Sequence, residues 1–503
     1  MALSGGPATD TKKTPRSSVK QTTQLLLAMM ALTTIAKLLG MLRSARIAAL
    51  FGIGVEAEAL AAAGRLPNML LEILPAAAIS GCFLPIFGRK RTDKGGFTAC
   101  FGILFLLILT MLALVCGQLT RPLTSALFPG LSPDAVALTE RLLARYALTL
   151  LPMGMVALLT ALCQAGEHYL RPPIVGLSAN ALELAVLYRS YTLSPLRVVD
   201  LRLLTLCLSC ILLAYPLRFT GLPRLRAGIS PLKQALARLP AAIIAALLMP
   251  LSLGAATAIA SYQTGGTALL SYAVTLFSAV LGITASGVIN YSFPKLAATG
   301  DAVTRMRRTA EAFLAILSIS LPLSLLLCLL APEGVSLLYH RGHLAENDAL
   351  AIARVLSLLA LSLPFCTAEE FFSRLALLAD DKRSAVLPPL IGAMALLPLS
   401  LLLRPLGPEG GAIAFGICHL TAALLQGYCL RHQLPKHLLA PLPYFLWGLA
   451  VLCLVYELAS RLLPPLCGTN PLLLSVSVAL PGGFLYLIVC RFTIGRERSI
   501  PLS

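Results

Sequence analysis

The stretch that decides the fold is residues 36–87, AKLLGMLRSARIAALFGIGVEAEALAAAGRLPNMLLEILPAAAISGCFLPIF. It consists of an apolar segment, a turn broken by glycines and a second apolar segment. Charged side chains lie within or beside both apolar runs, namely Lys37, Arg43, Arg46, Glu56, Glu58, Arg65 and Glu72. Each charge at bilayer depth costs roughly 2.5–3.5 kcal/mol, so this cluster requires partners or a function.

The second apolar segment carries a regular pattern of charge. Glu58, Arg65 and Glu72 stand seven residues apart, which is nearly two helical turns, so they form one stripe of alternating sign. Pro67 is expected to interrupt this helix, with the amide of Asn68 beside the break. Two interpretations of the stripe remain open: a structural network of ion pairs, or the lining of a cavity for an anionic or amphiphilic solute.

The composition is that of an integral membrane protein. Of the 503 residues, 57% are hydrophobic and 12% are charged, whereas a soluble domain would carry about 25% charged residues. The net charge of +18 belongs to basic residues dispersed at the ends of apolar runs, which indicates positive-inside topology rather than a nucleic-acid partner. The thirteen cysteines lie almost entirely in apolar runs, and we expect them to pack as small apolar side chains.

The apolar segments predict an all-α polytopic membrane protein with about fourteen transmembrane helices, each near the ~20 residues that span a bilayer. The predicted spans are 22–42, 58–87, 97–119, 143–165, 173–190, 200–217, 240–261, 267–292, 311–331, 351–379, 384–403, 410–430, 441–460 and 471–490. If both termini are cytoplasmic, about two dozen Lys and Arg fall inside and about seven outside, the asymmetry that sets orientation. The N-terminus carries no signal-peptide pattern.

A long basic loop at 217–239 separates two sets of six predicted spans, as in a duplicated transporter. The predicted organisation is a cytoplasmic tail at 1–20, a first six-helix lobe at 21–217, a basic cytoplasmic linker at 218–239, a second six-helix lobe at 240–432, and a C-terminal helix pair with its tail at 433–503.

Motifs of catalysis are absent from the sequence. It contains no Walker loop, HExxH or GxSxG, and its six histidines are scattered, so we predict no enzyme activity, no cofactor and no metal. His340 and His343 are expected to lie in an exposed polar loop. Further polar residues fall inside predicted spans, namely Asn180, Glu183, Asn290, Glu369, Glu370 and Arg374. Glu370 and Arg374 have the i,i+4 spacing of an ion pair.

These motifs resemble the MurJ (MviN) family of lipid II flippases, within the multidrug/oligosaccharidyl-lipid/polysaccharide exporter superfamily. The resemblance rests on LLGMLR at 38–43, FGIG at 51–54, the acid Glu58, RLPN at 65–68 and FLP at 83–85. Weaker support comes from LLYHRGHLAENDA at 337–349, SRLALLADDKRSA at 373–385, where Asp381 and Arg383 match, and GPEGGAIAFG at 407–416. The likeness covers roughly residues 22–432.

The resemblance implies two six-helix lobes in a V around a cationic cavity that opens alternately to each side. It implies transport of the undecaprenyl-pyrophosphate-linked peptidoglycan precursor, lipid II, from the cytoplasmic to the periplasmic leaflet. A pyrophosphate is bound well by Arg or Lys donors in a low-dielectric cleft. By resemblance, the substrate-binding residues are Lys37, Arg43, Glu58, Arg65 and Asn68.

The chain also departs from the family pattern. Leu71 and Glu72 replace basic residues, Ala76 replaces a glutamate, and Thr275 stands where the eighth helix of the family carries an arginine. Either fewer cations hold the substrate, chiefly those of the first two helices, or this divergent member has another substrate.

We therefore predict a lipid II flippase of the bacterial inner membrane. The alternatives are a related polysaccharide-lipid or drug exporter, and a non-transporting membrane scaffold of the same fold. A cavity lined by Lys37, Arg43 and Arg65 favours a transporter, whereas a packed bundle that neutralises them favours the scaffold. The expected partners are lipid II and membrane lipid, with the cell-wall synthesis machinery as a further candidate.

Overall fold

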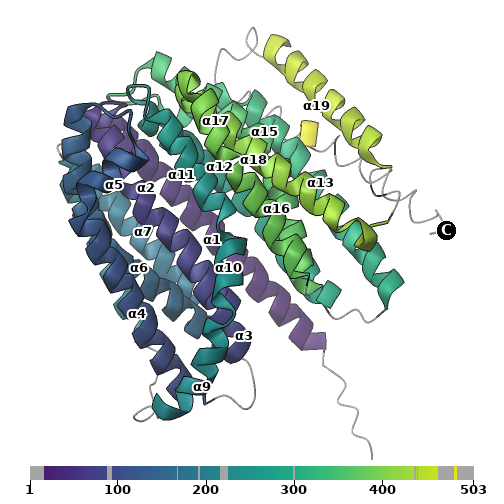
Figure 1. Cartoon of the computed structure of the whole chain (residues 1–503). Helices are drawn as coiled ribbons and strands as arrows, with labels where there is room; N and C mark the ends of the chain where they lie inside the picture. The colour runs from purple at the N-terminus through teal and green to yellow at the C-terminus, as the bar shows by residue number, and fades with distance from the viewer. Residues whose placement is uncertain are drawn as a thin grey trace, which may run out of the picture.

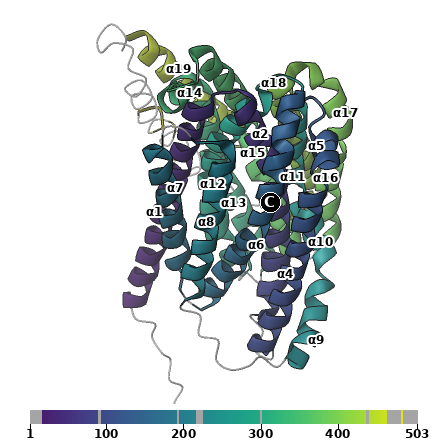
Figure 2. The ribbon, with the colours of Figure 1, turned by 90° about the vertical axis from the view of Figure 1, so that its left-hand side faces the viewer.

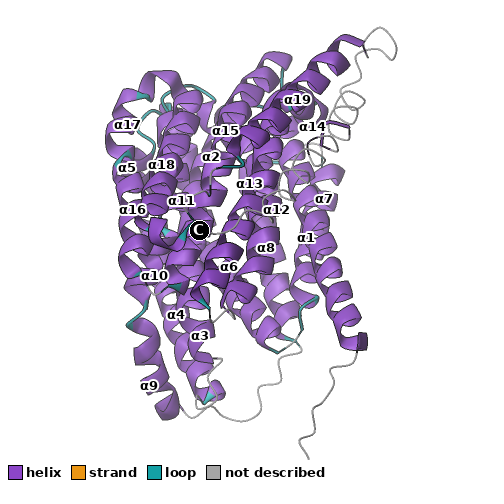
Figure 3. Cartoon of the chain, turned by 90° about the vertical axis from the view of Figure 1, so that its right-hand side faces the viewer, coloured by secondary structure: helices purple, strands orange, loops and turns teal. Residues whose placement is uncertain are grey.

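The computed structural model describes residues 16–87, 93–166, 168–190, 193–215, 225–297, 301–379, 381–435, 438, 440–462, 481–483 and 486. Figure 3 shows this part of the chain as helices joined by loops, so the predicted all-α polytopic fold is confirmed. Every predicted span up to 441–460 coincides with one helix or with consecutive helices. The span predicted at 471–490 lies almost entirely outside the described residues.

Eight helical stretches in the described ranges are long and apolar enough to cross a membrane unaided. Some of the remaining predicted spans fall short because they carry charges or are broken into shorter helices. Helix α8 carries Arg197, Asp200 and Arg202 along its 20 residues, while α10 and α11 are two shorter halves of one predicted span, divided at Leu247. Charges and breaks in a spanning helix are tolerated where neighbouring helices satisfy them, and Arg202 of α8 pairs with the buried Glu183.

The first lobe contains the predicted spans up to residue 217. Its elements are α1 (Arg16–Phe51), α2 (Val55–Pro75), the π-helix η1 (Ala76–Phe83), α3 (Leu84–Phe87), α4 (Lys94–Gln118), α5 (Thr120–Leu127), α6 (Pro133–Ala165), α7 (Arg171–Arg189) and α8 (Pro195–Ala214). Within it, α6 packs against α2, α4 and α8, and α7 packs against α1 and α8.

The second lobe is formed by helices from further along the chain. Its elements are α10 (Leu239–Ala246), α11 (Leu248–Ala260), α12 (Gly266–Ala297), α13 (Ala302–Leu329), α14 (Ala331–Tyr339), α15 (Glu346–Leu378), α16 (Lys382–Met394), α17 (Leu396–Leu402), η2 (Arg404–Leu406) and α18 (Gly407–Cys429). Helix α15 is central to this lobe, because it packs against α12, α13, α16 and α18.

Three elements lie outside the two lobes. Helix α9 (Leu225–Leu236) precedes α10 and packs beside the start of α4 (Figures 1 and 2). The short helix η3 (Arg431–Gln433) follows α18, and α19 (Leu442–Leu462) packs against α13 on the outer surface of the second lobe (Figure 1). The division at 217 and 240 stays a prediction.

The second predicted span differs from expectation in the position of its break. Helix α2 runs without interruption through Pro67, which is buried, and it changes geometry only after Pro75, where the π-helix begins. A helix can pass through a proline when its neighbours support it, and α2 is packed on both sides, by α6 and by α12. The predicted interruption at Pro67 is therefore wrong.

One loop motif acts as a helix cap. The carboxylate of Asp381 accepts hydrogen bonds from the Ser384 amide at 3.2 Å and from its hydroxyl at 2.6 Å, at the start of α16. These bonds lower the pKa of the Asp381 carboxyl. Ser384, which replaces the threonine of the family motif, supplies a hydroxyl of the same kind.

The two lobes meet at the end of the molecule where α1 stops and α2 begins. Gly52 follows α1 with a φ of 59°, a conformation that glycine adopts without strain. Its carbonyl accepts a hydrogen bond from the Tyr272 hydroxyl at 2.9 Å, and the His343 amide donates to the Ala49 carbonyl at 3.0 Å. We call these contacts of residues 44–58 with residues 265–272 and 339–343 the seal.

Candidate functional site

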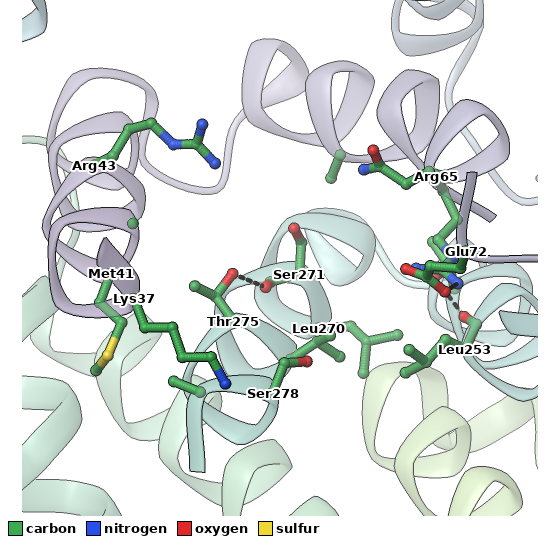
Figure 4. A pocket seen from close by; sticks show the side chains of 16 residues that line it. Lys37, Met41, Arg43, Arg65, Glu72, Leu253, Leu270, Ser271, Thr275 and Ser278 are labelled. Carbon is green, nitrogen blue, oxygen red and sulfur yellow. Dashed lines mark hydrogen bonds and ion pairs between the residues drawn. The ribbon is translucent and has the colours of Figure 1, made fainter. Parts of the chain in front are cut away.

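A cavity of about 390 Å³ lies between the lobes. Its walls come from α1 and α2 of the first lobe and from α11 and α12 of the second. The lining residues are Lys37, Gly40, Met41, Arg43, Ala61, Arg65, Asn68, Glu72, Leu253, Thr257, Leu270, Ser271, Val274, Thr275, Ser278 and Ala279. Figure 4 shows Lys37 and Arg43 on one side of it and Arg65 with Glu72 on the other.

Lys37 reaches across from α1 to the surface of α12. A Cβ atom on Gly282 would stand 1.7 Å from the Lys37 ammonium nitrogen, so an alanine there would displace the ammonium from this position. Among the described residues, no carboxylate lies within ion-pair distance of Lys37. Its positive charge is therefore available to a ligand in the cavity.

Arg43 faces the cavity and is also anchored behind it. Its guanidinium donates to Glu183 of α7 at 2.5 Å, and Arg202 of α8 donates to the other oxygen of the same carboxylate at 2.9 Å. Thr205 adds a hydroxyl donor at 2.6 Å. Glu183 is thus saturated by two arginines and a hydroxyl, and it neutralises only one of the two positive charges beside it.

Arg65 is held at the opposite wall. It donates to the carbonyl of Pro250 on α11 at 3.0 Å and pairs more loosely with Glu72 at 3.4 Å. The side chain of Arg65 is 13% exposed, whereas that of Glu72 is 43% exposed. Asn68 lies one turn from Arg65 and is exposed to the same cavity. The predicted stripe therefore contains one real ion pair, between Arg65 and Glu72.

The second lobe contributes hydroxyls rather than charges to this cavity. Thr257, Ser271, Thr275 and Ser278 line the walls on α11 and α12, and the Thr275 hydroxyl donates to the Ser271 carbonyl at 2.9 Å (Figure 4). Position 275, at which the family pattern has an arginine, therefore faces the cavity.

Glu58 lies apart from the cavity, in the seal. Its side chain is buried, and its carboxylate lies beside the backbone amides of Gly265 and Thr267 at the start of α12, with Oε1 left without a hydrogen-bond partner. The Thr267 hydroxyl also donates to the Glu58 carbonyl at 3.3 Å. A carboxylate at a helix N-terminus is stabilised by the free amides there, so Glu58 ties α2 of the first lobe to α12 of the second.

Four of the five predicted site residues, Lys37, Arg43, Arg65 and Asn68, thus meet around one cavity. Its described lining holds three cations and one carboxylate, an excess of positive charge. Arg43 and Arg65 each keep a buried Nε–H with no hydrogen-bond partner. Such donors in a site partly shielded from water bind a multiply charged anion strongly.

The sequence did not reveal what lies behind Arg43. Glu183 is identifiable from the sequence as a polar residue within a predicted span, but its pairing with Arg43 joins positions 140 residues apart, and no sequence motif indicates that Arg202 pairs with the same carboxylate. The only available signal was that α8 is unusually charged for a spanning helix. The predicted pair of Glu370 and Arg374 is confirmed, at 2.7 Å, and the side chain of Asn290 lies outside the described part of the chain.

The chain is similar to proteins of a known family. The profile of the lipid II flippase MurJ family matches residues 47–473. The chain belongs to this family. It is 25% identical over 411 residues to a probable lipid II flippase MurJ of Rhizobium tropici, covering 75% of this chain and 74% of the relative.

Solved structures of the same fold include a MurJ and a related exporter. A lipid II flippase MurJ in an inward closed conformation matches with a TM-score of 0.79 and 17% identity, over 94% of this chain and 99% of the other. An inward-facing multidrug resistance transporter of the MATE family matches with a TM-score of 0.62 and 14% identity, over 81% and 97%. The chain is therefore a multi-pass protein of the bacterial inner membrane and a member of a transporter family.

Proposed function

We propose that this chain moves lipid II from the cytoplasmic to the periplasmic leaflet by alternating access of the cavity between its lobes. The observation that carries the proposal is the set of cations on the first-lobe wall of that cavity. Lipid II contains a diphosphate with a negative charge on each phosphate, and its polyprenyl tail can remain in the bilayer while the head group crosses.

Each predicted residue has a role in this proposal. Lys37, Arg43 and Arg65 bind the diphosphate, and Asn68 offers an amide beside them. Glu58 stabilises the seal, because its carboxylate contacts the start of α12. This contact must break when the lobes separate at that end of the molecule. In the proposed cycle, opening at the seal alternates with opening at the opposite end.

The size of the cavity bears on the cycle. Its 390 Å³ is near the lower limit of ligand pockets, about 300–1,000 Å³. It is large enough for a diphosphate, and we propose that the lobes move apart when the rest of the head group enters.

The remaining predictions complete the proposal. Both termini and the linker around α9 lie on the cytoplasmic side, the chain acts as a transporter and catalyses no reaction, and the cell-wall synthesis machinery is a candidate partner. The driving force can come from the membrane potential, about 2.3 kcal/mol per charge per 100 mV.

A related exporter is the second candidate. It is favoured by one observation, that the described residues of the second lobe present Thr275 and other hydroxyls to the cavity but no cation. A substrate with a single phosphate, or with none, would need fewer positive charges.

The deciding experiment is rescue of a bacterium depleted of its own lipid II flippase. We expect the wild-type chain to restore growth and to prevent accumulation of the lipid-linked precursor. If correctly inserted wild type and Thr275→Arg both fail at normal abundance, lipid II is not the substrate and the exporter becomes the better interpretation.

A further inference from the structure

A second polar cluster lies inside the second lobe, apart from the cation cavity. It consists of Ser252 on α11, Glu369 and Ser373 on α15, and His419 and Gln426 on α18, all buried. The ring of Phe415 lies 4.5 Å from the imidazole of His419 and closes one side of it. Buried histidine and glutamate in a spanning segment are expensive to maintain, so this pair calls for a function.

Nε2 of His419 contacts a serine hydroxyl. The Ser252 hydroxyl lies 3.0 Å from the Met249 carbonyl and 3.1 Å from Nε2 of His419, where the roles of donor and acceptor depend on the tautomer of the ring. A hydroxyl has one proton, so while Ser252 donates to Met249, Nε2 is the donor in the second contact. Nδ1, on the other side of the ring, then carries no proton.

One carboxylate oxygen of Glu369 faces Nδ1 of His419. Gln426 donates to the Ser373 hydroxyl oxygen at 2.7 Å, and Ser373 donates to Oε1 of Glu369 at 3.0 Å. Oε2 stands 3.7 Å from Nδ1 of His419, and that nitrogen has no hydrogen-bond partner. A neutral imidazole protonated on Nε2 would point a lone pair at a carboxylate. The contact becomes attractive only when a further proton lies on Nδ1 or on Oε2.

The described residues around the pair do not supply a compensating charge. Within 248–260, α11 has no acidic or basic side chain, and the hydroxyl of Tyr272 on α12 donates to the Gly52 carbonyl. On α15, Cys366 contacts the imidazole, while Glu370 is paired with Arg374. Cys418 adjoins His419 on α18, and the basic residues of α16, Lys382 and Arg383, are at its first turn. With one shared proton the pair is neutral, and without it a negative charge is buried.

Helix α11 connects this pair to the cation cavity. Ser252 contacts His419, the next residue, Leu253, lines the cavity, and the carbonyl of Pro250 accepts the hydrogen bond from Arg65. A change in the charge of the His419 imidazole therefore acts on the same helix that holds a diphosphate ligand in place.

We propose that Glu369 and His419 form the binding site of a coupling proton, and that its uptake and release move α11 and change access to the cation cavity. The proton comes from water and returns to water, and it binds between Oε2 and Nδ1 without any other chemical change. The role in transport rests on the proposed function, whereas the effect on access can be measured without any substrate.

The test uses a cysteine introduced at Ser278 in the cavity, in the full-length protein with its reactive native cysteines replaced. The rate of reaction with a water-soluble maleimide is measured against pH and divided by the rate for the unfolded protein at the same pH. We expect this corrected rate to depend on pH, with a limiting slope of about tenfold per pH unit for one proton. Glu369→Gln and His419→Gln should abolish the dependence, and Glu370→Gln, on the same helix, should keep it.

A wild-type rate that does not vary with pH overturns the proposal, and so does a Glu369→Gln variant that keeps the wild-type dependence. If Glu369→Gln and His419→Gln do not fold, the proposal is tested with Ser252→Ala. It keeps both titrating groups but removes the partner of Nε2, so the midpoint of the pH dependence should shift, and an unchanged midpoint contradicts the proposal. Failure to rescue flippase depletion, with pH-dependent labelling intact, counts only against lipid II as the substrate.

Discussion

Replacing Arg43 with glutamine separates substrate binding from structural support, because the structure gives Glu183 a second arginine. In Arg43→Gln, the Glu183 carboxylate keeps Arg202 at 2.9 Å and Thr205 at 2.6 Å. No buried charge loses all its partners, so the expected loss of stability is that of one charge-assisted hydrogen bond, about 1.5–3 kcal/mol. The cavity, however, loses one of its three cations.

The expected effect on binding follows from the contact that is lost. Each charge-assisted hydrogen bond to a diphosphate contributes about 1.5–3 kcal/mol, which corresponds to roughly a ten- to hundredfold loss of affinity. Arg43→Gln should therefore be present in the membrane at near wild-type abundance and fail to rescue the depleted bacterium. The measurements are growth, precursor accumulation and abundance of the tagged protein at equal expression.

The matched control removes both arginines. Arg43→Gln combined with Arg202→Gln leaves the buried Glu183 with Thr205 as its hydrogen-bond donor, a stranded charge that costs about 3–5 kcal/mol. That is a large share of a typical stability of 5–15 kcal/mol, so the double variant should be depleted from the membrane. A binding role of Arg43 is excluded if Arg43→Gln rescues as well as wild type, or if its abundance falls as far as that of the double variant.

Three further predictions follow from the same site. Thr275→Arg places a cation on the second-lobe wall and should improve rescue, as growth at limiting expression would show; unchanged rescue would argue against a diphosphate near α12. Gly282→Ala should displace the Lys37 ammonium and reduce transport, whereas Gly176→Ala on α7, where an added Cβ meets nothing within 4 Å, should have no effect in the same rescue assay. In intact cells, impermeant thiol reagents should label single cysteines that replace His340 or His343 and should not label those that replace Lys94, Lys233 or Arg305. Labelling at Lys94, Lys233 or Arg305 would overturn the proposed orientation.

The sequence was sufficient to predict the helices and part of the cavity lining. Span positions follow from local hydropathy, because every backbone group in a bilayer must be satisfied within a helix. Charges in an apolar run must be buried against something, so Lys37, Arg43 and Arg65 require partners or a function whatever their neighbours, and the family resemblance adds Asn68. The motifs around them were also enough to indicate the family.

Pairing across the bundle could not be predicted, because it depends on which helices pack together. Glu58 and Arg65 belong to one stripe of α2, yet Glu58 faces the start of α12 in the seal while Arg65 reaches α11 and Glu72. Likewise, Glu369 and His419 are 50 positions apart, and nothing in their local sequence shows that they face each other.

The sequence by itself therefore determined that this chain is a bundle of spanning helices with cations in its first two spans. Only the tertiary structure decided which of those charges remain available to a ligand. The physical reason is that hydropathy and helical periodicity act within one segment, whereas the partner of a buried charge is set by packing between segments distant in the chain.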